Sequence, residues 1–471
     1  MTDVQAATIE FGLSGVDLLV QAKTGTGKTT AFLLPAIENL INQPPPQNQI
    51  SIVVLSPTRE LALQIEKEAK GLLQNHPLKV QSVIGGTNMK TESNRLSAGQ
   101  CDILVATPGR LIDHLQNGAL KQRVQCLQTL VLDEADRLLD QGFKPELEKI
   151  LTFLPNRQQV PRQCMLYSAT LSQPIKQIAS LYLHPNHQFV STLRDDEVNT
   201  HQHVPQSFVI VPIEDSLPAV LAILKEEIAT NGDSAKCMVF CTTARGTSVA
   251  ATVLANAGGS DLPPVYEIQS RMSQSARSKN AEAFKSAKSA ILFSSDVTAR
   301  GMDFPGVTLV LQIGLPSSAE QYIHRLGRTA RAGAGGRGII LLSNAESFFL
   351  GGREMNKLPI TRHTPLPPLE RGRVATALAS LDEQTQQQAY AAWLGFNKSF
   401  LRQFKWTSQR FVEEGNKYAR EVLGWLDANP PPISKKSVGM MGLKHCPGLN
   451  VVDRLPWDTE KAARKPQPRK K

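Results

Sequence analysis

A glycine-rich run near the amino end of the chain has the composition of a phosphate-binding loop. It follows the apolar run LLVQ and precedes a helix-like segment. Glycines let a backbone approach a phosphate chain, a lysine neutralises the outer phosphates and a hydroxyl binds Mg²⁺. The general pattern has glycine where this chain has alanine, and the run comprises Ala22, Lys23, Thr24, Gly25, Thr26, Gly27, Lys28 and Thr29. The run therefore predicts a site for a nucleoside triphosphate.

An acidic cluster further along the chain has the groups that such a site needs for its metal. Asp133, Glu134 and Asp136 follow the apolar run LQTLVL. This places Asp133 at the carboxyl end of a strand, where doubly wound sheets bind ligands. There Asp133 can hold Mg²⁺ and Glu134 can reach an attacking water. Alone, an acidic cluster is more often a solvated helix start, but its pairing with the glycine-rich run favours catalysis.

A third cluster, HRLGRTAR at residues 324–331, is rich in arginine. Arginines placed across from a phosphate loop neutralise the charge that develops in phosphoryl transfer, which is worth roughly 10³–10⁵ in rate. By itself such a run is more often a surface ion-pair face or an RNA contact. In combination with the other two clusters, it predicts catalytic arginines.

Alternating apolar runs and amphipathic stretches surround these clusters. From Asp17 to about Val190, the runs LLVQA, SIVVLS, DILVAT and LVLDEAD alternate with helix-like segments, one of which begins at about Arg59. This alternation predicts a parallel sheet with helices on both faces. The polar stretch 191–203 is typical of a linker. A second α/β unit follows, with the apolar runs FVIVP, MVFCT, AILFSS and TLVLQIG.

Length and composition predict how the chain is divided into domains. Its 471 residues are enough for about three domains. Beyond residue 350 the strand signals fade, PLPPLERGR indicates a boundary, and helix-like segments run from about Ala375 to Asp427. The predicted parts are a first α/β domain (1–195), a linker (196–207), a second α/β domain (208–350), a helical extension (351–460) and a disordered basic tail (461–471).

Positive charge is concentrated in the last quarter of the chain. Residues 1–350 hold 31 basic and 31 acidic side chains, whereas residues 351–471 hold 21 and 11. This asymmetry predicts a polyanion as partner, most simply nucleic acid or an anionic membrane surface. No apolar run approaches the ~20 residues of a membrane-spanning helix. Six scattered cysteines suggest a reducing compartment and no structural zinc.

The carboxyl-terminal part also holds all four tryptophans. Trp393, Phe396, Phe400 and Phe404 recur at near-helical spacing. We favour a helix core for these rings over an exposed platform on which bases stack.

Taken in order, the motifs resemble those of the DEAD-box ATP-dependent RNA helicases. They cover essentially residues 1–350 and are AKTGTGKT (22–29), PTREL (57–61), GG (85–86), TPGR (107–110), DEAD (133–136), SAT (168–170), MVFCTT (238–243), SSDVTARGMD (294–303) and HRLGRTAR (324–331). The resemblance implies two RecA-like doubly wound parallel-sheet domains plus a mainly α-helical C-terminal extension. It also implies ATP and Mg²⁺ bound on one side and single-stranded RNA on the other.

The resemblance implies roles residue by residue. Three residues would be catalytic, with the arginines provided by the second domain: Glu134, Arg328 and Arg331. Mg²⁺ would be held by Thr29 and Asp133, and the nucleotide would contact residues 22–29, Gln5 and Asp303. Hydrolysis would be coupled to strand separation through Asp136, Ser168, Thr170 and His324. The RNA sugar–phosphate backbone, read with low sequence preference, would contact Arg59, Thr107, Pro108, Gly109, Arg110, Thr298 and Arg300.

Two positions depart from the family pattern. The family reads adenine with a glutamine, which Gln5 supplies, and stacks the base on an aromatic further upstream, for which Met1 leaves no room. Either the chain is truncated or its ATP site is incomplete, and we expect the native reading frame to start further upstream. Ala330 stands where glycine is more usual, and we expect it to be tolerated.

Within the family, the run DEADRLLDQGFKPELEKIL and the helical extension with its basic tail look most like fungal mitochondrial members. That resemblance implies an RNA helicase or RNA chaperone that hydrolyses ATP on RNA binding, unwinds short duplexes and aids mitochondrial intron splicing, RNA folding or translation. The alternatives are a low-turnover ATP-gated RNA clamp and a nuclear or nucleolar ribosome-assembly helicase, and a DNA translocase is disfavoured. We expect a monomer of the mitochondrial matrix, although no presequence is visible, that binds single-stranded and structured RNA and no membrane.

Overall fold

The computed structural model describes residues 1–22, 25–117, 120–193, 204–298, 302, 304–330, 335–455 and 457. The chain divides into two units, each described by itself: unit 1 comprises residues 1–199 and 301–303, and unit 2 comprises residues 200–300 and 304–471. Among the described residues, no helix is both long enough and apolar enough to cross a membrane.

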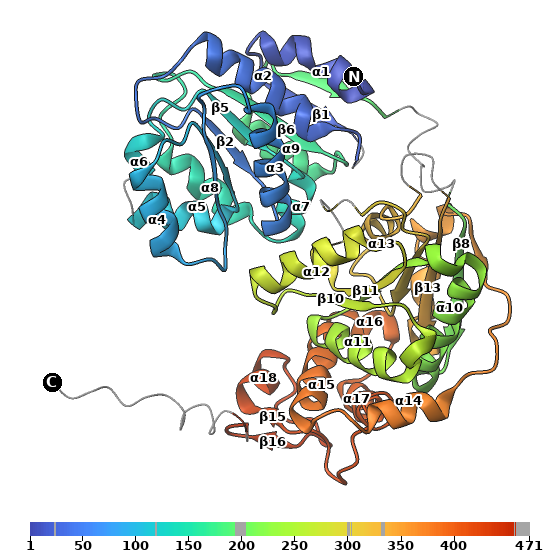
Figure 1. Ribbon diagram of the computed structural model, residues 1–471. Helices are drawn as coiled ribbons and strands as arrows, with labels where there is room; N and C mark the ends of the chain where they lie inside the picture. Colours follow the sequence, from blue (N-terminus) through green and yellow to red (C-terminus); the bar gives the residue numbers. More distant parts are fainter. Residues whose placement is uncertain are drawn as a thin grey trace. The chain divides into compact units, whose positions relative to one another are not determined.

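Unit 1 is built around a parallel seven-stranded sheet (Figure 1). The strands pair in the order β3-β4-β2-β5-β6-β1-β7, so β6 lies between β5 and β1. Every strand except the edge strand β7 is almost wholly buried, as a parallel sheet covered by helices requires. The strands are β1 (Leu18–Gln21), β2 (Ile52–Leu55), β3 (Val80–Val83), β4 (Ile103–Ala106), β5 (Thr129–Leu132), β6 (Gln163–Ser168) and β7 (Gln188–Ser191).

Helices cover both faces of this sheet because alternate strand residues point to opposite faces. Ile52 and Val54 pack against α1, α2 and α3, whereas Val53 and Leu55 pack against α5, α7, α8 and α9. The helices are α1 (Asp3–Leu13), α2 (Lys28–Asn42), α3 (Arg59–Leu72), α4 (Met89–Ala98), α5 (Pro108–Asn117), α6 (Leu120–Arg123), α7 (Ala135–Asp140), α8 (Lys144–Phe153) and α9 (Gln173–Tyr182).

Unit 2 repeats the plan with a second parallel seven-stranded sheet. Its strands pair in the order β10-β11-β9-β12-β13-β8-β14. They are β8 (Gln206–Val211), β9 (Lys236–Cys241), β10 (Val265–Ile268), β11 (Ala290–Ser294), β12 (Leu309–Ile313), β13 (Arg337–Ser343) and β14 (Ile360–Arg362). The helices of this part are α10 (Ser216–Asn231), α11 (Ala244–Gly258), α12 (Gln274–Ser286) and α13 (Ala319–Leu326). The prediction of doubly wound parallel sheets is therefore confirmed for both units.

A helical region follows β14 and shares the hydrophobic core of unit 2. Tyr390 and Leu394 belong to the same buried cluster as Val239 of β9. Trp393 stacks on Phe411 and Tyr418, with ring centroids 5.8 and 5.0 Å away, as the helix-core interpretation predicts. The elements are α14 (Arg371–Leu378), α15 (Glu383–Asn397), α16 (Leu401–Phe404), α17 (Ser408–Glu421), β15 (Ile433–Ser434), α18 (Lys435–Met440) and β16 (Val451–Val452).

The five-part division made from the sequence stays a prediction. Residues 196–203 of the proposed linker and all of the tail, 461–471, lie outside the described residues. The mainly helical character expected for the region after residue 350 is confirmed by the helices α14 to α18.

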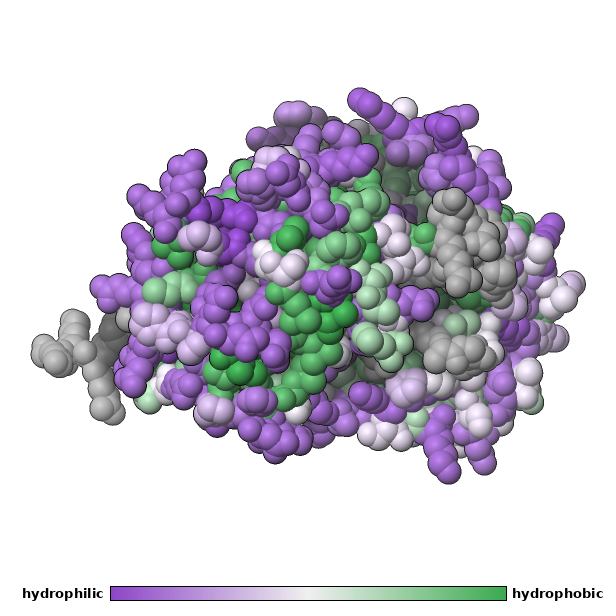
Figure 2. All heavy atoms as spheres, turned by 90° about the horizontal axis from the view of Figure 1, so that it is seen from above, coloured by the Kyte–Doolittle hydropathy of each residue, from purple (hydrophilic) through white to green (hydrophobic). Residues whose placement is uncertain are grey.

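The surface drawn in Figure 2 is mostly hydrophilic, with one larger hydrophobic area near the middle of the view and smaller ones around it. Helices α1 and α2 bury Val4 and Phe32 completely. Each of these helices therefore has one side in the core, while their large exposed apolar side chains are Phe11, Leu13, Leu34 and Ile41.

Candidate functional site

The glycine-rich run connects β1 to α2. Gly25 and Gly27 have φ angles of 79° and 86°, in the left-handed region that favours glycine. Gly27 caps α2, which begins at Lys28. The Nζ of the buried Lys28 donates a hydrogen bond to the carbonyl oxygen of Ala22 at 2.9 Å. The ammonium therefore lies over the loop at the positive end of a helix dipole, an arrangement suited to phosphate.

Gln5 on α1 contacts the same loop. Its Nε2 donates a hydrogen bond to the carbonyl oxygen of Gly27 at 3.3 Å, and its Oε1 accepts one from the backbone N–H of Thr2 at 2.9 Å. A Cβ atom added to Gly27 would lie 2.6 Å from Gln5 Nε2. The glutamine expected to read adenine is thus held at the phosphate loop. Its side chain approaches Gly27 so closely that a residue with a Cβ atom would not fit there.

The acidic cluster lies at the carboxyl end of β5. Asp133 and Glu134 are 3% and 5% exposed, and the backbone N–H of Glu134 donates a hydrogen bond to Asp133 Oδ1 at 3.0 Å. Glu134 has a φ of 47°, a left-handed conformation that costs a non-glycine residue roughly 1–2 kcal/mol. Such strain clusters at functional sites. Here it turns the chain sharply between β5 and α7.

The electrostatics of this cluster suit a bound cation. Burial, followed by the negative charge of Glu134, raises the pKa of Asp133 to about 7, and the charge of Lys28 opposes that rise. Glu134 Oε2 accepts no hydrogen bond among the described residues and lies 3.6 Å from Arg137 Nη1. Neighbouring buried carboxylates are costly unless a cation compensates them. A carboxylate together with the hydroxyl of Thr29 is an oxygen donor set that fits Mg²⁺.

The loop after β6 connects the acidic cluster to the phosphate loop. The backbone N–H of Ala169 donates a hydrogen bond to Asp136 Oδ2 at 3.3 Å, and that of Ala22 donates one to the carbonyl oxygen of Ser168 at 3.0 Å. Ser168 Oγ accepts a hydrogen bond from the backbone N–H of Thr170 at 3.3 Å. The structure therefore brings together three of the predicted coupling residues, Asp136, Ser168 and Thr170.

A second cluster in unit 1 gathers the predicted RNA-contacting residues. Arg59 begins α3, and its guanidinium lies against the double glycine, since a Cβ on Gly86 would collide with Arg59 Nη1. Thr107 Oγ1 accepts a hydrogen bond from the backbone N–H of Gly85 at 3.2 Å. The turn 107–110 then opens α5. Three separate motifs, PTREL, GG and TPGR, thus form one surface.

Glu92 is a residue of this cluster that the sequence analysis did not identify. Its carboxylate accepts hydrogen bonds from Arg110 Nη1 at 3.0 Å and from the backbone N–H of Ile84 at 3.1 Å, and it lies 2.9 Å from His114 Nε2. Arg110 also donates to the carbonyl oxygen of Thr87 at 3.0 Å. Arg110 therefore holds the double-glycine loop to α5. No motif spacing points to Glu92, because its partners lie in other elements.

In unit 2, the loop after β11 is joined to α13 through Asp296. Asp296 Oδ1 accepts hydrogen bonds from Arg325 Nε and Gln321 Nε2, both at 2.7 Å. Arg325 is completely buried, and its guanidinium carbon lies 5.6 Å from the ring centroid of Phe240. Thr298, expected to lie near RNA, is completely buried as well, and its hydroxyl donates to Ser294 Oγ at 2.6 Å. The first residues of the SSDVTARGMD motif are therefore held by hydrogen bonds to buried residues of unit 2.

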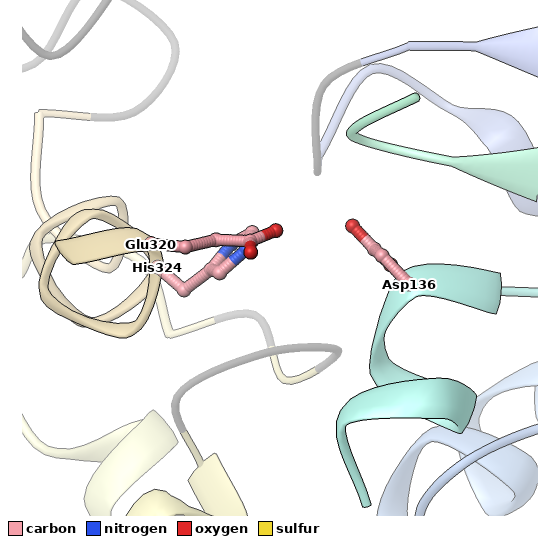
Figure 3. A group of neighbouring side chains, drawn as sticks. All are labelled: Asp136, Glu320 and His324. Atoms are coloured by element: carbon pink, nitrogen blue, oxygen red, sulfur yellow. The ribbon is translucent and has the colours of Figure 1, made fainter. Parts of the chain in front are cut away.

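The arginine-rich motif begins in the last turn of helix α13, which ends at Leu326. The side chains of His324 and Glu320, one turn apart on the helix, lie side by side (Figure 3). His324 Nε2 is 3.4 Å from Glu320 Oε1. Arg328 is 2% exposed and follows the end of the helix. Ala330 has a φ of 51°, which explains physically why glycine would suit this position.

Several predicted site residues lie outside the described residues. They are Lys23, Thr24, Arg300, Asp303 and Arg331. The roles implied for them, and for the described site residues, stay predictions.

Comparisons with known proteins agree with this geometry. Residues 2–178 match the family described as DEAD/DEAH box helicase, and residues 219–333 match the family described as helicase conserved C-terminal domain. DEAD-box ATP-dependent RNA helicase 25 of Arabidopsis thaliana is 43% identical over 462 residues, which cover 96% of this chain and 79% of that protein. The chain belongs to the DEAD-box RNA helicase family. The resemblance inferred from the motifs is thereby confirmed.

Other relatives of this DEAD-box chain are fungal. The mitochondrial ATP-dependent RNA helicase MSS116 of Phaeosphaeria nodorum is 43% identical over 451 residues, covering 93% of this chain and 80% of that protein. A solved structure of Mss116p bound to single-stranded RNA and AMP-PNP has a TM-score of 0.81 and 30% identity, covering 96% of this chain and 92% of that one. The RecA-like assignment of the two units is therefore confirmed.

Some relatives are considerably longer than this chain. It spans 52% of DEAD-box ATP-dependent RNA helicase 26 and 62% of helicase 31 of Arabidopsis thaliana, to both of which it is 44% identical.

Proposed function

We propose that this chain is an RNA-dependent ATPase that locally unwinds short RNA duplexes. One observation carries the proposal: the buried Lys28, at the loop after β1, and the Asp133–Glu134 pair, at the end of β5, meet at one edge of the sheet. Carboxyl ends of parallel strands are where doubly wound sheets bind nucleotides. Membership of the DEAD-box family supports ATP as the nucleotide.

We assign each group at this edge a role in ATP hydrolysis that its chemistry allows. Lys28 would bind the outer phosphates, and Thr29 and Asp133 would hold a Mg²⁺ ion, whose charge would neutralise that of the phosphates. Glu134 accepts a proton from the attacking water. We also propose that Asp303 contacts the nucleotide and that two arginines of unit 2, Arg328 and Arg331, act at the phosphates.

We propose that RNA contacts the surface formed by PTREL, GG and TPGR in unit 1 and the motif around Thr298 and Arg300 in unit 2. Arg59 supplies a cation at this surface, where its guanidinium lies beside the exposed Gly86. Because Thr298 is completely buried and its hydroxyl donates a hydrogen bond to Ser294 Oγ, we propose that it supports the loop after β11 beside the RNA. Such contacts would read backbone charge with little sequence preference.

The catalytic proposal is tested by steady-state ATP hydrolysis with and without a single-stranded RNA, and with a DNA of equal length. RNA should stimulate turnover more than DNA. Glu134→Gln should lower the RNA-stimulated kcat by at least about 100-fold. The matched control Glu148→Gln, exposed on α8, should leave kcat unchanged.

Equal stimulation by DNA would contradict the RNA specificity, and full activity of Glu134→Gln would contradict the proposed base. A Glu134→Gln chain that still supports RNA function in cells would instead favour an ATP-gated clamp. Strand separation is measured separately, with a short RNA duplex, ATP and Mg²⁺.

We further propose a mitochondrial role in intron splicing, RNA folding or translation, with the chain acting as a monomer on single-stranded and structured RNA. The name of the Phaeosphaeria nodorum relative supports this compartment, whereas the names of the plant relatives state none. The test is microscopy of the protein expressed from its own genomic locus with a carboxyl-terminal fluorescent tag. Signal in mitochondria would support the proposal, and signal in the nucleus or nucleolus would favour ribosome assembly.

A further inference from the structure

A proline-rich segment of unit 2 has a burial pattern that repeats every three residues. In residues 362–369, here called the proline strap, His363, Leu366 and Leu369 are partly buried and the other residues are exposed. The side chain of His363 is only 6% exposed. A strand would alternate every two residues, and a helix every three to four. A period of three is that of the polyproline II helix, which has three residues per turn.

The hydrogen bonds of the strap agree with this conformation. Polyproline II has no internal hydrogen bonds. Among the described residues, no backbone–backbone hydrogen bond involves residues 364–368. Near the two ends of the strap, the His363 N–H donates to the carbonyl oxygen of Phe208, and the Leu369 carbonyl accepts from the Arg371 N–H. The strap is therefore an extended segment that begins where β14 ends.

Both ends of the strap are fastened to the core of unit 2. On the amino side, β14 pairs with β8 through Arg362 and Phe208. On the carboxyl side, Arg371 donates hydrogen bonds to the two carboxylate oxygens of Asp215 at 2.6 and 2.8 Å. In addition, Lys225 Nζ donates to Glu370 Oε1 at 2.6 Å. A segment held in this way loses little conformational entropy when it binds a partner.

The exposed side of the strap presents a specific set of groups. Arg362, Pro365 and Pro368 are all exposed and three residues apart, so they share one side of a polyproline II helix. Arg362 makes no ion pair within the described part of the chain. A cation followed by two prolines at this spacing matches ligands of domains that bind proline-rich segments in aromatic grooves.

We propose that the proline strap is a docking ligand for an SH3-type domain of another protein. Aromatic rings of that domain would hold Pro365 and Pro368, and a carboxylate beside its groove would pair with Arg362. RNA is a poorer occupant, because one exposed cation neutralises few phosphates. The strap leaves the sheet from its β14 edge, whereas the helicase motifs of unit 2 lie on β9 or follow β9, β11 and β12. Docking would therefore leave the motifs of unit 2 accessible.

The test is calorimetric titration of the full chain with a purified SH3 domain that binds Arg-x-x-Pro-x-x-Pro peptides. Arg362→Glu, and the double variant Pro365→Ala/Pro368→Ala, should each weaken binding by about tenfold or more. Pro367→Ala is the matched control, because Pro367 is an exposed proline of the same strap that the three-residue period leaves out of the series Arg362, Pro365 and Pro368. It should change the Kd by less than about twofold. Thermal midpoints of all variants verify that they are folded.

Absence of binding by the wild-type chain would overturn the proposal. An equal loss of binding in Pro367→Ala would also overturn it, because that result would show no preference for one side of the strap. If Arg362→Glu weakened RNA binding and left SH3 binding unchanged, the strap would be an RNA contact. RNA-stimulated ATP hydrolysis, measured on the same variants, should remain at the wild-type rate, so a failure here is distinguishable from a failure of the proposed helicase function.

Discussion

At the scale of single residues, the proposed role of Asp133 as a Mg²⁺ ligand requires an ionised carboxylate that destabilises the nucleotide-free fold. Its pKa is raised to about 7 by burial and then by Glu134, so the folded state keeps a proton that the unfolded chain loses near pH 4. The free energy of unfolding of the nucleotide-free protein should therefore fall as pH rises from about 4 to 7. Mg²⁺ with nucleotide should reduce this loss, because a cation stabilises the ionised carboxylate.

Asp133→Asn should raise stability above pH 7 while abolishing ATP hydrolysis. The neutral amide avoids the cost of a buried charge, and each tenfold change in the proton affinity of a carboxylate corresponds to about 1.4 kcal/mol. Thermal unfolding of the nucleotide-free chain at pH 8 should show a gain that disappears near pH 4. Glu148→Gln, which removes an exposed carboxylate, should show no gain at either pH. A loss of stability in Asp133→Asn at pH 8 would contradict the raised pKa of Asp133.

Ala330 offers a second test at the residue scale. Because its φ is 51°, Ala330→Gly should relieve strain of up to about 1 kcal/mol, after the greater entropy of glycine in the unfolded chain is deducted. Ala281→Gly, in the middle of α12, should lower stability by about 1 kcal/mol. Thermal unfolding of the two variants should thus shift the midpoint in opposite directions, and equal shifts would exclude strain at Ala330.

At the scale of elements, Glu92 holds α4, α5 and the double-glycine loop together. Burial alone would raise its pKa, but hydrogen bonds from His114, Thr87 and Ile84 and the charge of Arg110 outweigh burial, and the pKa is lowered. This stabilisation is therefore present above the pKa that Glu92 has in the unfolded chain and is lost as pH falls through the lowered value. The network stabilises the surface that we assign to RNA.

Glu92→Gln should destabilise the chain by about 3 kcal/mol, because it leaves the buried guanidinium of Arg110 without its carboxylate. Asp113→Asn is the matched control: Asp113 lies 4.0 Å from the same arginine but is 54% exposed. Its loss should cost less than about 1 kcal/mol. Thermal or urea unfolding distinguishes the two variants, and RNA titration should show weaker binding for Glu92→Gln alone. Equal costs for the two variants would contradict the special role of Glu92.

At the scale of the whole molecule, the excess positive charge lies beyond the two sheets. Residues 461–471 carry six positive charges. Deleting them should flatten the dependence of RNA affinity on salt, because each phosphate contact adds to that slope. The measurement is the RNA Kd at several salt concentrations for the full and shortened chains. An unchanged slope would show that the tail makes no RNA contact, and the ATPase rate without RNA, which serves as the control, should be the same for both chains.

The sequence by itself determined the two α/β units, the order of the motifs and the family. Apolar periodicity and the Gly25–Thr29 spacing are local properties that act over a few residues, and the strand-loop-helix succession can therefore be read directly along the chain. The helix core around Trp393 was also predictable from spacing alone.

Only the tertiary structure decided which residues meet. Glu92 and Arg110, or Asp296 and Arg325, are joined by contacts between separate elements, and no periodicity marks them. The raised pKa of Asp133 depends on burial, and the inward hydroxyl of Thr298 depends on its neighbour Ser294. The three-residue period of the proline strap likewise arises from packing against the core. These properties depend on distances between residues far apart in the chain, which packing of the folded state alone establishes.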